Sequence, residues 1–127
     1  VWSKRYDQIN AFEDTLIASG TTILKFFLLI DRDEQRARLQ ARLDDPDKHW
    51  KFRLRDLEER KLWDAYIAAY VEMLRRCSTP GAPWYVIPSN KKWFRNLAVA
   101  DIVGDALEEL DPAYPPSPDD LTNVVIE

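Results

Sequence analysis

A run of apolar residues, "TTILKFFLLI" at positions 21–30, constrains the fold of this chain more than any other feature. Its longest uninterrupted apolar stretch, Phe26 to Ile30, is far shorter than the ~20 residues that cross a bilayer, so the sequence predicts no membrane span. Bulky side chains occupy both alternating faces of the run. Such a strand is buried on both sides, as in a parallel sheet with helices on each face. The run therefore predicts a core strand of an α/β fold.

Helix signals lie on both sides of this strand. Asn10 and Glu13 have the spacing of a capping box, and Gly20 is a typical residue just beyond a helix C-terminus. They predict a helix that begins at Asn10. Asp31 and Glu34 repeat the capping arrangement directly after the strand and predict a second helix.

The middle of the chain predicts an insertion between two strands. The second helix should end at about Leu43, because Asp45 precedes a proline. Strict alternation of apolar and basic residues from Trp50 to Arg55 predicts an extended flap. Asp56 and Glu59 can cap a further helix. Its apolar residues form one stripe: Trp63, Ile67, Tyr70, Leu74 and Cys77.

A second short strand, "WYVI", ends at Pro88 after the loop "STPGAP", and Ser89 can cap a last long helix. Strand, helical insertion, strand and helix make a βαβ unit with parallel strands. Two strands cannot bury both of their faces alone, so we expect further strands beside them and interpret the chain as half of an α/β domain. The proline-rich residues after Pro112 should be extended.

Charge is distributed unevenly along the chain. The net charge is −4, yet ten of the eighteen Lys and Arg residues lie between Arg32 and Lys61, and eight acids and no bases follow Arg95. This asymmetry concentrates positive potential where a polyanion could bind. No signal segment is visible at Val1 and the single Cys77 cannot form an internal disulfide, so we expect a cytoplasmic protein.

Several catalytic motifs are missing from the sequence. Its three glycines form no G-x-x-x-x-G-K or G-x-G-x-x-G loop. We assign no catalytic residue, because His49, the only histidine, is best interpreted as an exposed residue and Cys77 as part of the apolar stripe. Asp44, Asp45 and Asp47 are better explained by helix termination than by metal binding.

Basic side chains are the strongest functional signal. Arg38 and Arg42 share one helical face, Lys51 lies on the flap, and Lys92 and Arg95 lie near the start of the last helix. Forked guanidinium donors, ammonium groups and a helix N-terminus together suit phosphate oxygens. The alternative is that these bases only pair with nearby acids on the surface. Four tryptophans could stack on nucleobases, although core packing is favoured for each of them: Trp50, Trp63, Trp84 and Trp93. Trp50 has the strongest case for a functional role, because it lies between lysines and outside a regular apolar stripe.

Five segments together resemble the second polyphosphate kinase family, whose members are P-loop kinases that use inorganic polyphosphate as phosphoryl donor. They are, in chain order, "RYDQINAFE", "TTILKFFLLIDRDEQ", "RLDDPDKHWKF", "DLEERKLWDAY" and "APWYVIPSNKKWFRNLAVA". The resemblance covers nearly the entire chain and implies a three-layer α/β/α fold. Residues 1–111 would form its C-terminal part, with a lid at about 42–61 and an extended tail at 112–127.

The resemblance also implies an activity. The complete enzyme would transfer a phosphoryl group between polyphosphate and AMP or ADP with Mg²⁺ held mainly outside this chain, and it would be a homo-oligomer without a membrane or a specific nucleic acid as partner. Seven bases match basic positions of the family and would contact phosphate: Arg38, Arg42, Lys48, Lys51, Arg60, Lys92 and Arg95. The family's phosphate loop and acidic metal-binding motif are absent from the chain, so we expect it to be inactive alone.

Other readings remain open from the residues. An ATP-dependent P-loop nucleotide kinase would differ in its donor. A module for single-stranded nucleic acid would use the same bases and tryptophans and would bind oligonucleotides at least as strongly as polyphosphate. An interaction module would show no preference for polyphosphate.

Overall fold

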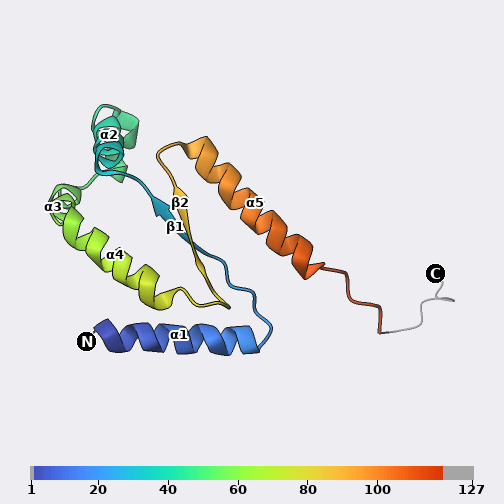
Figure 1. The fold of residues 1–127 in the computed structure, drawn as a ribbon. Helices are drawn as coiled ribbons and strands as arrows, with labels where there is room; N and C mark the ends of the chain where they lie inside the picture. The colour runs from blue at the N-terminus through green and yellow to red at the C-terminus, as the bar shows by residue number, and fades with distance from the viewer. Residues whose placement is uncertain (1, 119–127) are drawn as a thin grey trace, which may run out of the picture.

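The computed structural model describes residues 2–118, and Figure 1 shows the strands between helices on two sides. The element order is α1 (Trp2–Ala18), β1 (Lys25–Leu29), α2 (Arg32–Leu43), the 3₁₀ helix η1 (Pro46–Lys51), α3 (Arg55–Lys61), α4 (Trp63–Cys77), β2 (Trp84–Pro88) and α5 (Lys92–Leu110). In Figure 1, α4 and α5 lie on opposite sides of the strands, and α1 crosses one end. None of the helices described here is long and apolar enough to cross a membrane.

The strands β1 and β2 are parallel, as the βαβ interpretation predicts, and pair from Lys25–Trp84 to Leu29–Pro88. β1 is shorter than the apolar run, because the residues before Lys25 have no partner residue in β2. Leu28 and Val86 remain 48% and 47% exposed. Within residues 2–118 the sheet is therefore only partly covered, which agrees with the expectation of further strands.

α1 begins at Trp2, so the predicted start at Asn10 is wrong. Asn10 lies in the middle of α1, and its side chain donates from Nδ2 to the carbonyl of Arg76, 2.9 Å away. Glu13 does not reach back to a cap but pairs with Lys25. Both side chains bind partners on other elements, and this tertiary pairing overrides the local capping pattern. The predicted end is confirmed, since Gly20 has a φ of +86°.

α2 has the predicted bounds and cap. The Asp31 carboxylate accepts from the backbone N–H of Glu34 at 2.7 Å. Glu34 does not complete the box, because its carboxylate pairs with Arg38. The helix ends at Leu43, and Asp45 then caps η1 with Pro46 in its first turn.

The predicted extended flap is wrong. Residues Pro46–Lys51 form a 3₁₀ helix and Arg55 already begins α3, which leaves a short irregular link between them. Proline fixes a φ that suits the first turn of a helix, and Asp45 satisfies a free N–H at its start. These local signals outweigh the alternation of side chains that predicted a strand.

The helix predicted from Asp56 onward is divided into α3 and α4 at Leu62. Asp56 does not begin α3, although its carboxylate accepts from the backbone N–H of Arg53. The apolar stripe faces the sheet as predicted: Cys77 is buried and the Tyr70 ring packs on Phe27 with centroids 5.0 Å apart.

Ser89 does not cap α5, which begins at Lys92. Its hydroxyl donates to the carbonyl of Ile87 instead. α5 ends at Leu110, followed by Asp111 in the left-handed region with a φ of 41°. Residues 112–118 contain no helix or strand, and the remainder of the predicted tail lies outside the described residues.

Candidate phosphate-binding site

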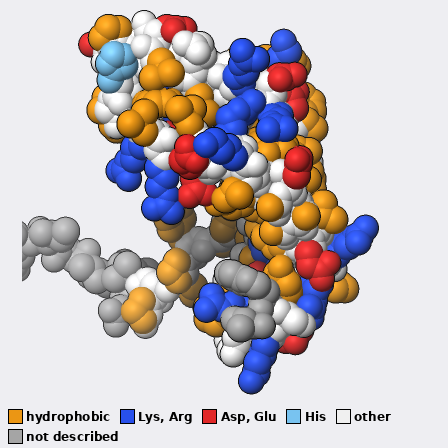
Figure 2. All heavy atoms as spheres, turned by 90° about the vertical axis from the view of Figure 1, so that its left-hand side faces the viewer, with side chains coloured by type: hydrophobic (Ala, Val, Ile, Leu, Met, Phe, Trp, Pro, Cys, Tyr) orange, Lys and Arg blue, Asp and Glu red, His pale blue; other side chains and the backbone are white. Residues whose placement is uncertain are grey.

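A cavity of about 490 Å³ lies among β1, α2, α3 and α4, and basic side chains lie around it. Figure 2 shows Lys and Arg side chains grouped with a few acids on this side of the molecule. Arg38, Arg42 and Arg60 line the cavity together with Asp56 and Glu59. The cavity is therefore of mixed charge rather than uniformly basic.

The guanidinium of Arg38 already donates hydrogen bonds to other groups of the protein. Its Nε lies 2.7 Å from the Glu34 carboxylate, and its Nη2 donates to the carbonyl of Ser89 at 2.7 Å and to that of Asn90 at 3.4 Å. The side chain is half-buried between α2 and the loop that leads from β2 to α5. Its guanidinium joins two elements of the fold.

Arg60 makes a similar connection from α3 to the start of α2. Its Nη1 donates to the carbonyl of Arg32 at 2.8 Å and to the side-chain oxygen of Gln35 at 2.7 Å. Neither acceptor is charged. The positive charge of Arg60 therefore remains without a carboxylate among residues 2–118 while its position is fixed.

Arg42 and Lys51 form a basic pair that we call open because neither side chain has a carboxylate partner within residues 2–118, although Arg42 is half-buried and only Lys51 is exposed. The Nη1 of Arg42 makes a long contact of 3.4 Å with the carbonyl of Lys51, which places the two residues side by side. The Lys51 ammonium lies over the ring of Trp50, 4.8 Å from its centroid. In the part of the chain described, neither Arg42 nor Lys51 has a carboxylate partner.

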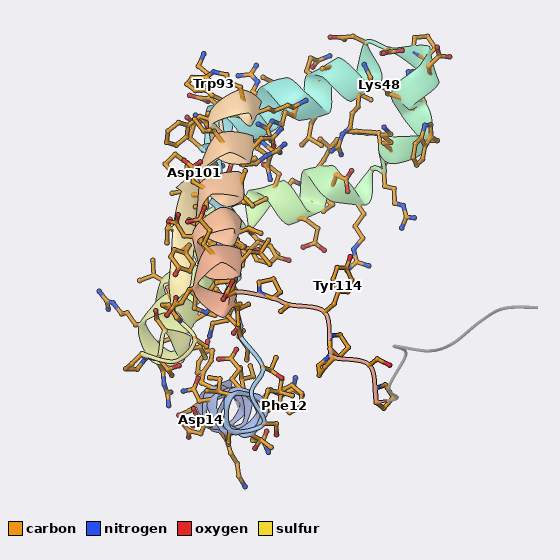
Figure 3. All side chains as sticks on the ribbon, turned by 90° about the vertical axis from the view of Figure 1, so that its right-hand side faces the viewer. Phe12, Asp14, Lys48, Trp93, Asp101 and Tyr114 are labelled. Atoms are coloured by element: carbon orange, nitrogen blue, oxygen red, sulfur yellow. The ribbon has the colours of Figure 1, made fainter. Side chains whose placement is uncertain are left out.

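The remaining predicted bases lie at the same end of the molecule. Lys48 pairs with Asp45, whereas Lys92, in the first turn of α5, has no acid partner within the described range. Arg95 binds the amide oxygen of Asn96 at 2.8 Å. Figure 3 shows Lys48 and the start of α5 at one end and α1 at the other.

The alternative interpretation, that the bases only form ion pairs with nearby acids on the surface, is therefore correct for some of them. It accounts for Lys48 and, in part, for Arg38, and also for Arg55 and Lys61, which pair with Glu59 and Glu58. It leaves Arg42, Lys51, Arg60, Lys92 and Arg95, which have no carboxylate partner in the described structure.

One acid of the cavity, Glu59, is held in its charged form. The pKa of the Glu59 carboxyl lies below its usual value, first because the Tyr66 hydroxyl donates to it and then because Arg55 does. Any anion entering the cavity therefore meets a fixed negative charge beside Arg42 and Arg60. This charge favours binding at the basic side of the cavity.

The sequence reasoning missed polar residues that bind the bases or the acids near them: Gln35 accepts from Arg60, Tyr66 donates to Glu59, and Asn90 donates to Asp31. Asn90 had a usable signal, since it closely follows the carboxyl end of a parallel strand, where ligand sites form in α/β sheets. The core assignment is wrong for Trp50 and Trp93, which are 77% and 66% exposed. Trp63 and Trp84 are half-buried.

His49 and Cys77 lie in the surroundings that the sequence predicts for them. His49 is exposed and its Nε2 lies 2.9 Å from the carbonyl of Leu43, while Cys77 is buried. Burial, the main cause, raises the pKa of the Cys77 thiol. No cluster of three His, Cys, Asp or Glu side chains in the described region could hold a metal ion.

Comparison with known proteins decides the family. The model of the polyphosphate kinase 2 family matches residues 1–115. The chain belongs to the polyphosphate kinase 2 family.

Among these relatives, an AMP/ADP-polyphosphate phosphotransferase of Meiothermus ruber is 55% identical over the whole chain, which covers 48% of that protein. An ADP-polyphosphate phosphotransferase of Rhodopseudomonas palustris is 45% identical over 90% of the chain and 39% of its own length. The crystal structure of polyphosphate kinase 2 from Arthrobacter aurescens superposes with a TM-score of 0.88 at 48% identity, over 94% of this chain and 43% of that one. The chain thus spans less than half the length of these three polyphosphate kinase 2 proteins.

Proposed function

We propose that this chain is the lid-bearing part of a polyphosphate-dependent nucleotide kinase of the P-loop type, with a three-layer α/β/α fold when complete. The complete protein would transfer a phosphoryl group between polyphosphate and AMP or ADP, in the cytoplasm and as a homo-oligomer. The observation that carries the proposal is the open pair of Arg42 and Lys51 beside the cavity, in a chain of this family. Residues 1–111 would belong to the kinase domain, and residues 42–61 would be the lid.

In this reaction the chain's own residues bind and position phosphate. Phosphoryl transfer depends mainly on alignment and on neutralising negative charge. Arg42 and Lys51 supply donors that no carboxylate of residues 2–118 pairs with, and Arg60, Lys92 and Arg95 add charge from two further helices. Lys48 can join them when it leaves Asp45. Closure of residues 42–61 over the phosphates would exclude water.

Magnesium neutralises phosphate charge in reactions of this kind. The described residues hold no cluster that fits a metal, so the residues that bind Mg²⁺ would lie in other parts of the complete enzyme. By the same argument we expect the 127-residue chain to give no sustained turnover by itself, because it contains no glycine-rich phosphate loop. Sustained ADP formation from AMP and polyphosphate by the purified chain would contradict this expectation.

A chimera tests the activity directly. The segment of the Meiothermus ruber phosphotransferase that matches this chain is replaced by residues 1–127, and ADP and ATP formation from AMP is measured with polyphosphate as donor. Arg42→Ala and Lys51→Ala should each raise the KM for polyphosphate about tenfold or more, since a hydrogen bond to a charged group contributes ~1.5–3 kcal/mol. Arg53→Ala, a matched loss of charge between η1 and α3, should change it little.

The alternatives give different results in the same chimera. An ATP-dependent kinase would transfer from ATP and not from polyphosphate. A module for single-stranded nucleic acid would bind oligonucleotides at least as tightly as polyphosphate of similar charge. Equal KM values for wild type, Arg42→Ala and Lys51→Ala would remove these bases from the site.

A further inference from the structure

The parallel strands β1 and β2 end beside each other, and residues just beyond their ends also hydrogen-bond across the pair. The backbone N–H of Ser89 donates to the carbonyl of Leu29 at 2.7 Å. Beyond this bond, Asp31 and Asn90 exchange two more. The Asp31 backbone N–H donates to Asn90 Oδ1 at 3.1 Å, and Asn90 Nδ2 donates to Asp31 Oδ2 at 2.5 Å.

The Asp31 carboxylate also accepts a second hydrogen bond. Its other carboxylate oxygen, Oδ1, caps α2 by accepting from the backbone N–H of Glu34. One carboxylate thus binds the first turn of α2 and the loop before α5. Both interactions lower the pKa of Asp31, the Glu34 N–H more than the Asn90 side chain, so the carboxylate is charged at neutral pH.

Arg38 makes a third connection one turn further along α2. Its guanidinium donates to the carbonyl of Ser89 and is held by Glu34. The backbone oxygens that it binds belong to the loop leading into α5, where Lys92 and Arg95 lie. In this geometry a phosphate chain would have to displace existing partners to bind Arg38, whereas Arg42 lies four residues further along α2 without a carboxylate partner among the described residues.

We propose that Asp31, Arg38 and Asn90 form a bracket that fixes α2 and the start of α5 as one frame, so that Arg42 and Lys92 bind the same phosphate chain from set positions. The proposal rests on the proposed function. In this frame Arg38 and Asn90 are positioning residues, and Arg38 is not a phosphate ligand. Arg42 and Leu43, the first two residues of the proposed lid, would stay with α2, and the part of the lid that moves would begin after Leu43.

Exchange of the two side chains tests the bracket. Each single substitution, Asp31→Asn or Asn90→Asp, breaks the match between donor and acceptor. Asp31→Asn places the NH₂ groups of two amides against each other, and Asn90→Asp places two carboxylates against each other. The double variant Asp31→Asn/Asn90→Asp restores it: the residue at 31 can still cap α2 through its oxygen and donate to the carboxylate at 90. Asp33→Asn makes the same charge change in the first turn of α2, away from the bracket, and is the matched control.

The measurements use the chimeric enzyme and report KM for polyphosphate, KM for AMP and the dissociation constant of tripolyphosphate by calorimetry. We expect each single variant to raise the KM for polyphosphate and the dissociation constant about tenfold, the scale of one charge-assisted hydrogen bond to phosphate. The KM for AMP should stay near the wild-type value. The double variant should recover to within about threefold, and Asp33→Asn should match the wild type.

Far-UV circular dichroism at the assay temperature checks that each variant is folded. Asn90→Ala, which removes the amide without adding a charge, replaces any single variant that unfolds. Wild-type affinity in Asn90→Ala, or a folded double variant that binds as weakly as the single variants, would overturn the bracket while leaving the proposed function intact. Failure of the unmodified chimera to bind tripolyphosphate would overturn both.

Discussion

Lys25 is a charged residue inside the apolar strand from which the fold was predicted. Its side chain is 9% exposed, and its ammonium lies 2.6 Å from Glu13 Oε2 and 2.6 Å from the carbonyl of Cys77. The ring of Trp84 lies 5.4 Å away. One lysine therefore connects α1, β1, the end of α4 and β2. A buried charge is tolerated at this position because its partners are in place.

Replacing Glu13 by Gln should lower the free energy of unfolding by about 3 kcal/mol, because it leaves the Lys25 ammonium buried without its counter-charge. Urea unfolding followed by circular dichroism measures the change. Asp14→Asn, the next residue on α1 and exposed, is the control and should change stability by less than about 0.5 kcal/mol. Equal effects of the two substitutions would show that the Lys25 cluster contributes little.

The pKa of Asp31 provides a separate test of its partners. It is lowered from the ordinary value of 3.8, so the charged form is favoured in the folded state. The resulting stabilisation is complete above the unfolded value and is lost as the pH falls through the lower, folded value. Asn90→Ala should raise this pKa only partly, since the Glu34 N–H, the larger cause, remains.

Carboxyl ¹³C chemical shifts followed from neutral to acid pH measure this change. The pKa of Asp45, which Lys48 lowers, is an internal control and should not respond to Asn90→Ala. An Asp31 titration that is the same in wild type and Asn90→Ala would mean that the amide does not bind the carboxylate in solution.

Between α3 and α4 the helix is interrupted at Leu62, and one hydrogen bond spans the interruption. The Tyr66 hydroxyl on α4 donates to the Glu59 carboxylate on α3, which also raises the pKa of Tyr66. The Tyr66 ring stacks on Tyr70. This bond connects α4 to α3, the helix from which Arg60 reaches the cavity.

Tyr66→Phe should increase amide hydrogen exchange in α3 several-fold, because local opening needs less free energy once the bond is removed. Exchange in the second half of α4 should stay unchanged. Tyr70→Phe removes a hydroxyl for which no hydrogen bond is recorded among residues 2–118, and it should leave exchange in α3 as in the wild type. Faster exchange in both variants would assign the effect to ring packing.

At the scale of elements, local signals predicted the structure where no distant partner competed with them. Asp31 and the Asp45–Pro46 step set the bounds of α2 correctly, and the two apolar segments correctly predicted parallel strands. The start of α1 failed because Asn10 and Glu13 bind α4 and β1 rather than their own helix. No local pattern records which distant group a polar side chain will meet.

For the candidate site, too, the sequence predicts some features and the fold determines the others. Residue type and spacing named Arg42 and Lys51 as candidates, but did not separate them from Arg38 or show which bases would lack a carboxylate partner. Arg38 could be placed on the correct helix, but its contacts with Ser89 and Asn90 follow from the parallel pairing of β1 with β2 and are not encoded near it. Residue type therefore predicts a candidate ligand, and only the fold shows which candidates are occupied.

Across the whole molecule, apolar side chains of the sheet are left open in the described part. Leu28 and Val86 are examples, so we expect the purified chain to bind a hydrophobic dye and to self-associate. Light scattering after size-exclusion chromatography measures the mass. Val86→Thr should reduce association, because it makes the open strand face more polar while keeping a β-branched side chain.

The control for this prediction is Val71→Thr, the same chemical change at an exposed position of α4. It should leave the mass distribution unchanged. In the chimera, where the rest of the enzyme is present, dye binding should fall for the wild-type segment. A monomeric chain without dye binding would contradict the expectation of uncovered strands.

The bracket joins residues that the ribosome makes at different times. Asp31 and Asn90 are 59 positions apart, and all of α2, η1, α3 and α4 is synthesised between them. At about 5–20 residues per second, roughly 3–12 s pass before the partner of Asp31 exists. During that interval β1 has no β2 to pair with, and the helices that connect the two strands are joined to the sheet only through β1. Synthesis of β2 and Asn90 therefore completes the frame in one late step, and chaperone binding to the nascent chain would be most useful before it.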